Sequence, residues 1–295
     1  MSCSSAVKKR LSTVLAAALL LCATLFAGLA SSNELRGNRS PYLAMHGDDP
    51  VAWREWGLPA LQEARRSGRL LFVTSGYFTC YWCHVMQRES FLDKEVASTL
   101  NDNFIPVVVD RELLPALDAR LIDFVERTRG AAGWPLNVLI TPQGYPLVGI
   151  TYLPRDTFLQ FLHNVRQRWA AERDELSALA KHAAEQIRQQ RSAAAEDPSA
   201  KTLLSAMRRQ LESVADDLNG GFGQQNKFPM TPQLFALLRI YAATGDPALG
   251  EFLSLTLERM AYRGLNDVIG GGFFRYTVDP DWREPHFEKM LYDNA

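Results

Sequence analysis

The sequence predicts an α/β domain over residues 31–191 that is followed by an all-α region over residues 201–295. Three observations indicate this class. Short apolar runs typical of buried strands alternate with helical patterns in the first part of the chain. Two further apolar runs are separated by the turn Thr141-Pro142-Gln143-Gly144, which predicts a hairpin. Beyond residue 201 the periodicity is helical only.

The elements of the first domain follow one another in a recognisable order. Residues 39–56 are irregular and rich in aromatic side chains, and Pro59 then lies in the first turn of a helix that ends at Gly68. The expected strands are 70–74, 104–109, 136–140 and 145–150, with helices after Cys83, after Asp93, over 117–127 and over 156–191. The order α-β-α-β-α-β-β-α, with early parallel strands and a final hairpin, predicts a thioredoxin-like mixed sheet with helices on both faces.

A polar, proline-containing stretch at residues 192–200 is typical of a linker. After it, the pattern predicts helices over 203–218, 233–243 and 247–262, separated by glycine-rich turns. Roughly ninety residues with three amphipathic helices form only a marginal independent core. We therefore expect this region to be the start of a larger helical domain.

The composition gives no support for nucleic-acid binding. The chain has 295 residues, of which 47% are hydrophobic and 22% charged, and its net charge is -1. This balance is typical of a globular protein and provides no basic excess for nucleic-acid binding.

The first thirty residues form a separate segment. Lys8, Lys9 and Arg10 precede an apolar run over residues 11–30, and small side chains at the end of the run suit cleavage after Ala30. This pattern predicts a signal peptide. The run is also long enough to be a membrane anchor, which would tether the protein through residues 11–30. Because the positive flank stays inside, both interpretations predict an exported, periplasmic or extracytoplasmic protein.

Two of the four cysteines carry the main functional signal. Cys3 and Cys22 lie in the export segment, which leaves Cys80 and Cys83 for the remainder of the chain. A bridge across so short a loop stabilises little chain, so the pair favours redox chemistry over a structural role. The pair follows a buried strand and begins a helix, where the N-terminal amides stabilise a thiolate. We expect Cys80 to be the nucleophile and Cys83 the resolving thiol.

Trp134 and Pro135 complete the expected site. They immediately precede the strand at 136–140, the position at which this fold packs a cis-proline against the dithiol, and a cis bond is accessible before proline. With Trp82 they are predicted to shape the substrate groove. An ordinary trans-proline that opens a strand is the competing interpretation.

Other chemistries compete for the same cysteines. Cys80-Tyr81-Trp82-Cys83-His84 also matches the attachment pattern of c-type haem. Zinc is a weaker alternative, because two cysteines and one histidine do not complete a tetrahedral site. His84 is a candidate for tuning the thiolate or, equally, a solvated histidine. The dithiol interpretation requires no cofactor and no metal.

Longer motifs bear a resemblance to a known family. They are Ser40-Pro41-Tyr42-Leu43, His46, Pro50-Val51, Trp53, residues 80–86, Arg88-Glu89-Ser90-Phe91, Val109-Asp110-Arg111-Glu112, Gly133-Trp134-Pro135-Leu136, Lys227-Phe228-Pro229, Gly270-Gly271-Gly272-Phe273 and residues 286–294. They resemble the spermatogenesis-associated protein 20-like, thioredoxin domain-containing family. The resemblance implies a thioredoxin-like domain followed by an (α/α) six-hairpin toroid, of which this chain would hold the first hairpins. Thr74 stands where thioredoxins often bury an acid, so no proton acceptor for Cys83 can be assigned from the sequence.

The favoured hypothesis is an exported thiol–disulfide oxidoreductase that acts on protein or small-molecule disulfides and thiols. An alternative is carbohydrate binding or processing by the helical region, with His286 and Glu288 as candidate groups and the thioredoxin-like domain as an accessory. A polar pair at the start of a helix is the plainer interpretation of those two residues. A redox-inert scaffold is the third alternative.

Overall fold

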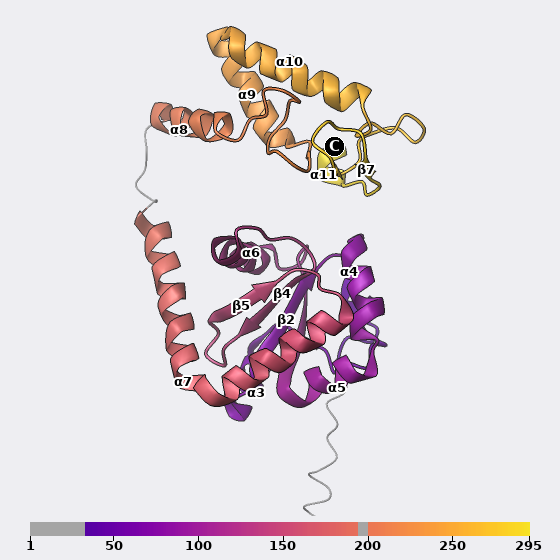
Figure 1. The fold of residues 1–295 in the computed structure, drawn as a ribbon, viewed down its shortest axis with the longest axis vertical. Helices are drawn as coiled ribbons and strands as arrows, with labels where there is room; N and C mark the ends of the chain where they lie inside the picture. Colours follow the sequence, from indigo (N-terminus) through magenta and orange to yellow (C-terminus); the bar gives the residue numbers. More distant parts are fainter. Residues whose placement is uncertain (1–32, 194–199) are drawn as a thin grey trace, which may run out of the picture. The chain divides into compact units, whose positions relative to one another are not determined.

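The computed structural model describes residues 33–193 and 200–295. They fall into two compact units that divide between Gln190 and Arg191 (Figure 1). The predicted export segment at residues 1–30, its possible tether at 11–30 and most of the predicted linker lie outside the described residues. Within the described part, no helix has both the length and the apolar character that a bilayer crossing requires.

The first unit is organised around one mixed sheet. Its strands are β1 (Arg54–Glu55), β2 (Leu70–Gly76), β3 (Phe104–Asp110), β4 (Leu136–Ile140) and β5 (Pro146–Ile150), in the spatial order β1-β3-β2-β4-β5. β1, β3 and β2 are parallel, whereas β4 runs antiparallel to both β2 and β5. The predicted thioredoxin-like α/β class is confirmed.

Helices cover both faces of this sheet. They are α2 (Pro41–Met45), α3 (Leu58–Ser67), α4 (Tyr81–Met86), the π-helix η1 (Gln87–Phe91), α5 (Lys94–Asn103), α6 (Pro115–Arg129) and α7 (Arg155–Ala193). On one face, Leu71 and Val73 of β2 pack with apolar residues of α3 and α6. On the other face, the Phe72 ring lies 6.3 Å from that of Phe91 and 5.6 Å from that of Phe158. Alternate residues of β2 therefore serve two different cores, which explains its unbroken apolar sequence.

The N-terminal segment is more ordered than predicted. Ser40 caps α2 by accepting a hydrogen bond from the Leu43 amide at 3.1 Å, and Pro41 fits the first helical position. β1 pairs with β3 through only two residues. A five-residue helix and a two-residue strand are too short to produce periodicity, so sequence patterns do not reveal them.

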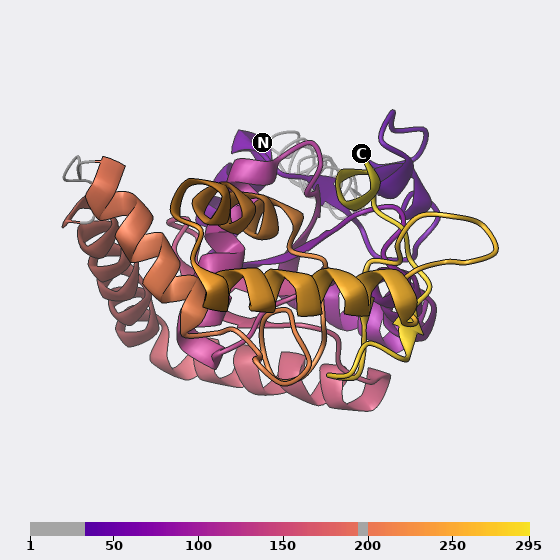
Figure 2. The same cartoon turned by 90° about the horizontal axis from the view of Figure 1, so that it is seen from above.

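The predicted long helix at 156–191 is bent. Figures 1 and 2 show the change of direction along α7. Its one non-helical residue is Glu172, at φ -128° and ψ 29°. Before the bend, the Trp169 indole donates a hydrogen bond to the Gly68 carbonyl at 3.0 Å. After it, Ile187 packs against the core shared by α3 and α6. The bend allows both halves of one helix to bury apolar side chains against the same unit.

The second unit is mainly helical. It contains α8 (Ala200–Glu212), α9 (Thr231–Thr244), α10 (Pro247–Tyr262), β6 (Tyr276–Thr277), β7 (Pro285–His286) and α11 (Leu291–Asn294). Its core includes Leu237, Leu253, Leu265 and Trp282. The helix predicted to reach residue 218 ends at Glu212 because the following loop is folded around Asp216. This buried carboxylate accepts hydrogen bonds from the Leu218 and Asn219 amides and from Lys227.

Candidate functional site

Cys80 and Cys83 form a disulfide at the start of α4, with their Cα atoms 5.3 Å apart. Cys80 is the N-cap of this helix, and its Sγ accepts a hydrogen bond from the Cys83 amide at 3.2 Å. The loop from Tyr77 to Thr79 joins the end of β2 directly to the cysteine pair. The strand–loop–helix context predicted for the motif is therefore present.

The surroundings distinguish the two sulfur atoms by position. Both cysteines are buried, with 3% and 1% of their surface exposed, so exposure alone does not separate them. Cys80 Sγ lies among the unpaired amides of a helix N-terminus, where positive potential stabilises a thiolate. Cys83 lies within the helix against the end of β2, and a Cβ on Gly76 would approach its Sγ to 2.7 Å. This arrangement suits Cys80 as the nucleophile and Cys83 as the resolving thiol.

The peptide bond between Trp134 and Pro135 is cis, and Pro135 is buried before β4. The Trp134 indole donates a hydrogen bond to Asp118 Oδ1 at 3.0 Å. The Arg111 guanidinium lies over the same indole, 4.1 Å from the ring centroid, and over Tyr77 at 5.4 Å. The indole is therefore held between a carboxylate and a cation.

Aromatic surface lies beside the disulfide. Trp82 is 42% exposed, and its ring lies 4.9 Å from that of Tyr152, which follows β5. Tyr81 is more exposed, and its ring is 5.3 Å from that of Trp82. Exposed rings next to this disulfide provide apolar contact area that a peptide or small molecule could cover.

His84 lies beside Phe78, and one nitrogen of its ring is engaged in a hydrogen bond there. Its Nε2 lies 2.7 Å from the Phe78 carbonyl oxygen, and a carbonyl only accepts, so Nε2–H is the donor. A c-type haem would need both sulfurs as thioethers and this nitrogen as a ligand. The residues as arranged do not fit that group. Within the described residues, no cluster of three or more histidine, cysteine, aspartate or glutamate side chains is arranged to hold a metal ion.

Sequence reasoning missed the polar residues beneath the disulfide. Tyr42 is buried, and both its hydroxyl and Cys83 Sγ lie within contact distance of the position that a Cβ on Gly76 would occupy. Burial raises the pKa of Tyr42 well above its usual range, and the carboxylates of Asp110, Asp49 and Asp118 raise it further. Residues 42 and 83 are far apart in the sequence, and no sequence pattern indicates that they lie close together in the fold.

Asp110 and Asp118 are both buried acids of this region. Asp110 ends β3 and accepts a hydrogen bond from Ser40 Oγ at 2.6 Å and from the Glu112 amide at 2.9 Å. Asp118, on α6, accepts one from Ser75 Oγ at 2.6 Å in addition to that from Trp134. Asp110 therefore caps the turn after β3, and its bond to Ser40 also fixes the N-terminal segment.

His286 and Glu288 lie together in the second unit. His286 Nε2 is 3.7 Å from Glu288 Oε2, which also receives a hydrogen bond from Arg275 at 2.8 Å. The His286 ring stacks on Tyr276 with centroids 4.6 Å apart. Burial lowers the pKa of His286, and Glu288 opposes this effect. Their role in carbohydrate chemistry stays a prediction.

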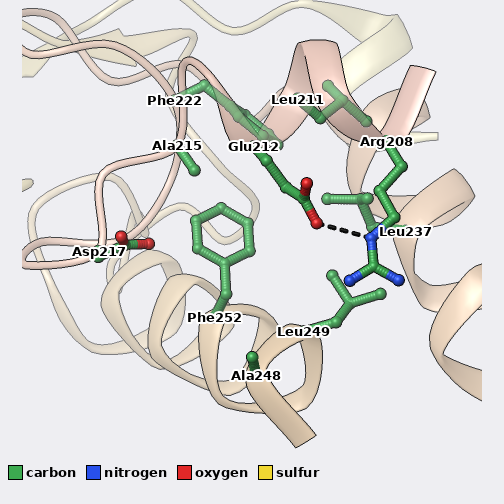
Figure 3. A pocket seen from close by; sticks show the side chains of 10 residues that line it. All are labelled: Arg208, Leu211, Glu212, Ala215, Asp217, Phe222, Leu237, Ala248, Leu249 and Phe252. Carbon is green, nitrogen blue, oxygen red and sulfur yellow. Dashed lines mark hydrogen bonds and ion pairs between the residues drawn. The ribbon is translucent and has the colours of Figure 1, made fainter. Parts of the chain in front are cut away.

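The second unit also contains an apolar cavity of about 170 Å³ between α8, α9 and α10 (Figure 3). Leu211, Phe222, Leu237 and Phe252 line it, and the Arg208–Glu212 ion pair lies at its edge. None of the site residues predicted from the sequence contributes to it.

The chain is similar in sequence to a group of longer animal proteins. It is 37% identical to spermatogenesis-associated protein 20 of Rattus norvegicus over 280 residues, which is 90% of this chain and 35% of that protein. The Homo sapiens protein of the same name is also 37% identical, over 278 residues, 89% of this chain and 35% of that protein. The chain thus spans about a third of the length of these relatives.

Solved structures of similar proteins match the first unit only weakly. One titled DsbH oxidoreductase has 16% identity and a TM-score of 0.33, covering 40% of this chain and 85% of that one. A thioredoxin from Thermus thermophilus has 23% identity and the same TM-score, covering 41% and 93%.

The model of one protein family matches residues 32–188, more than half of the chain. That family is described as Thioredox_DsbH, protein of unknown function, DUF255. A thioredoxin-like match of this kind supports a thiol–disulfide oxidoreductase-like role in general. Together with the β1-β3-β2-β4-β5 sheet, the matched residues lead to one conclusion: the chain belongs to the Thioredox_DsbH family.

Proposed function

We propose that the protein is a thiol–disulfide oxidoreductase whose redox centre is the Cys80–Cys83 pair. The observation that carries this proposal is the hydrogen bond from the Cys83 amide to Cys80 Sγ at the N-terminus of α4. The same amide and helix terminus stabilise Cys80 as a thiolate once the disulfide is reduced. The burial of both cysteines at the end of a strand supports the same role.

The reaction proceeds through a mixed disulfide. The Cys80 thiolate attacks one sulfur of a client disulfide, a new S–S bond forms, and the client's other sulfur leaves as a thiolate. Cys83 then attacks Cys80 Sγ, which breaks the mixed disulfide and releases the second client thiol. Two electrons pass from the dithiol to the client. The reverse sequence oxidises a client dithiol, and the reduction potential of the pair decides the direction.

The substrate surface that we propose is the aromatic area beside the disulfide. Trp82 and Tyr152 provide apolar contact, while Trp134 lies under the Arg111 guanidinium. A thioredoxin-like fold is compatible with protein thiol substrates. We propose clients that present a cysteine next to an apolar or aromatic side chain, since such residues match these rings.

A redox titration tests the proposal. The full chain, in a Cys3→Ser/Cys22→Ser background, is equilibrated with dithiothreitol buffers, and free thiols are counted by alkylation and mass spectrometry. We expect a single two-electron transition, which either Cys80→Ser or Cys83→Ser abolishes. With a disulfide-containing peptide, Cys83→Ser accumulates a mixed disulfide, whereas Cys80→Ser does not. The absence of any two-electron transition would overturn the proposal, and a Soret band with a pyridine-haemochrome spectrum would favour haem instead.

We also propose that the protein acts outside the cytoplasm. The basic residues 8–10, the apolar run at 11–30 and the small side chain of Ala30 support export. An oxidising compartment also favours a persistent disulfide. Fusion of residues 1–40 to alkaline phosphatase, which is active only after export, tests this point. We expect activity that is lost when residues 11–30 are deleted, and equal activity of the two fusions would contradict export.

A further inference from the structure

Beneath the disulfide, a residue from the N-terminal segment reaches the resolving sulfur. Tyr42 is the second residue of α2, far from Cys83 in the sequence, and 1% of its surface is exposed. A Cβ built on Gly76 would lie 2.7 Å from Cys83 Sγ and would meet the Tyr42 hydroxyl oxygen more closely still. The hydroxyl and the sulfur therefore both border the space above the last residue of β2, and only glycine leaves that space open.

A residue with a carboxylate lies level with Gly76 on the neighbouring strand. In the parallel ladder, Gly76 of β2 is in register with Asp110 of β3. Asp110 is 8% exposed and is held by Ser40 Oγ at 2.6 Å, the same serine that caps α2 and so positions Tyr42. One serine thus orders both the helix that carries the phenol and the acid beside it.

We propose that the Tyr42 hydroxyl is the proton relay of the resolving thiol Cys83, with the Asp110 carboxylate as the group that receives the proton. This inference rests on the proposed dithiol function and adds the groups that act on its second step. Neither Tyr42 nor Asp110 belongs to the Cys-x-x-Cys motif.

In the reducing direction, resolution of the mixed disulfide is coupled to two proton transfers. Cys83 S–H gives its proton to Tyr42 Oη while Tyr42 O–H gives its own proton to the Asp110 carboxylate. The Cys83 sulfur, with its electron pair freed, bonds to Cys80 Sγ, and the S–S bond to the client breaks. The client sulfur leaves with the electron pair of that bond. Asp110, now a neutral acid, returns its proton to solvent, and the phenol ends the step as it began.

The charges around Tyr42 explain why a relay is needed. Asp110 from β3, Asp49 from the α2–β1 connection and Asp118 from α6 all raise the pKa of the phenol, as does Tyr77, with burial the larger cause. His46, which is bound to Asp49, packs edge-on against the Tyr42 ring with centroids 5.2 Å apart. The Tyr42 phenol therefore stays protonated, and it passes a proton on without becoming a phenolate.

The test separates the two steps of one turnover. Reduced full-length protein, again lacking Cys3 and Cys22, is mixed with a disulfide peptide, and acid-quenched samples are resolved by mass spectrometry. Tyr42→Phe removes one oxygen and keeps the ring. We expect the mixed disulfide at Cys80 to form at the wild-type rate and to resolve on the order of 10²-fold more slowly at neutral pH. The deficit shrinks as pH rises, because hydroxide then removes the Cys83 proton. Tyr145→Phe, the same change in the β4–β5 turn, is the matched control and resolves like the wild type.

A second measurement reports on Cys83 directly. In a Cys80→Ser background, the pKa of the Cys83 thiol is followed by thiolate absorbance. Tyr42→Phe removes a donor to the thiolate and raises this pKa, whereas Asp110→Asn removes a like charge and lowers it. Both substitutions slow resolution. A merely structural role for these residues would not shift the pKa in opposite directions.

The outcomes are distinguishable from failure of the proposed function. If the wild-type chain shows no two-electron transition, the oxidoreductase proposal itself fails. If the wild type cycles but Tyr42→Phe resolves the mixed disulfide with an unchanged pH profile, the relay alone is overturned. Should Tyr42→Phe not fold, Asp110→Asn still decides the question, since normal resolution in that variant contradicts the relay.

Discussion

At the scale of single residues, Gly76 is the position on which the site depends most. It ends β2, and the space that a side chain would fill is already occupied by Cys83 Sγ and the Tyr42 hydroxyl. Its backbone also receives a hydrogen bond from the Arg111 amide at 2.9 Å. Because Gly76 has no side chain, α2, α4 and the segment that follows β3 can approach one another closely at this position.

Gly76→Ala tests this close approach. The added methyl group overlaps Cys83 Sγ and the Tyr42 hydroxyl, so one of them must move. We expect a loss of about 1–3 kcal/mol in the free energy of unfolding, the usual cost of overpacking, measured by urea denaturation of the oxidised protein. Gly133→Ala is the control, because a Cβ at Gly133 meets nothing within 4 Å. Equal stabilities of the two variants would contradict the steric argument.

At the scale of secondary structure, the cap of α5 connects two helices. Asp93 accepts hydrogen bonds from the Glu95 and Val96 amides, each at 3.0 Å, and forms an ion pair with Arg155 at the start of α7, also at 3.0 Å. The hydrogen bond from Val96 and then that from Arg155 lower the pKa of Asp93. The charged form of this carboxylate therefore favours the folded state.

Asp93→Ala removes both interactions, and we expect it to cost about 1 kcal/mol of stability, the typical value of an N-cap. Asp93→Asn keeps an acceptor for the amides and loses the charge, so it separates the cap from the ion pair. Because the folded pKa is lowered, the contribution of the charge is complete above the unfolded pKa of about 4 and is lost as pH falls below it. Urea midpoints at pH 7 and pH 3 measure this. A difference between wild type and Asp93→Asn that does not shrink at pH 3 would contradict the charge effect.

At the scale of the whole molecule, the second unit contains a fully buried ion pair. Lys227 Nζ lies 2.7 Å from Asp216 Oδ2, and neither side chain is more than 5% exposed. Burial raises the pKa of Asp216, but hydrogen bonds from Lys227 and from Asn219 and Leu218 outweigh it and bring the pKa to about 2. Folding of the loop after α8 is thereby linked to pH.

The second unit should lose stability in acid. Asp216 contributes on the order of 2 kcal/mol, which is fully present above about pH 4 and disappears as pH falls toward 2. Lys227→Met leaves the carboxylate buried without its cation and should cost about 3–5 kcal/mol at pH 7. Hydrogen exchange of amides in α9 and α10 measures both effects. Lys181→Met, on the exposed surface of α7, is the control, and an equally small change in both variants would refute the assignment.

Sequence periodicity predicted most of the elements of the first unit. β2, β3 and β4 were predicted because each is a run of apolar side chains bounded by turn residues, and α5 because Asp93 caps it. α2, β1 and the bend at Glu172 were not predicted. α2 depends on a single cap, β1 on a two-residue ladder, and the bend on packing against a distant core. None of these produces a repeating pattern of side chains in the sequence.

The sequence by itself determined the cysteine pair, its position between a strand and a helix, the proline before β4 and the thioredoxin-like class. These are local properties, set by apolar runs, turn residues and spacing over a few positions. Only the tertiary structure decided what lies beneath the sulfur atoms: Tyr42 from α2, Asp110 from β3 and Asp118 from α6. Such a cluster depends on the strand order and on the absence of a side chain at Gly76. The effect of both on the site arises only when distant segments of the chain pack together.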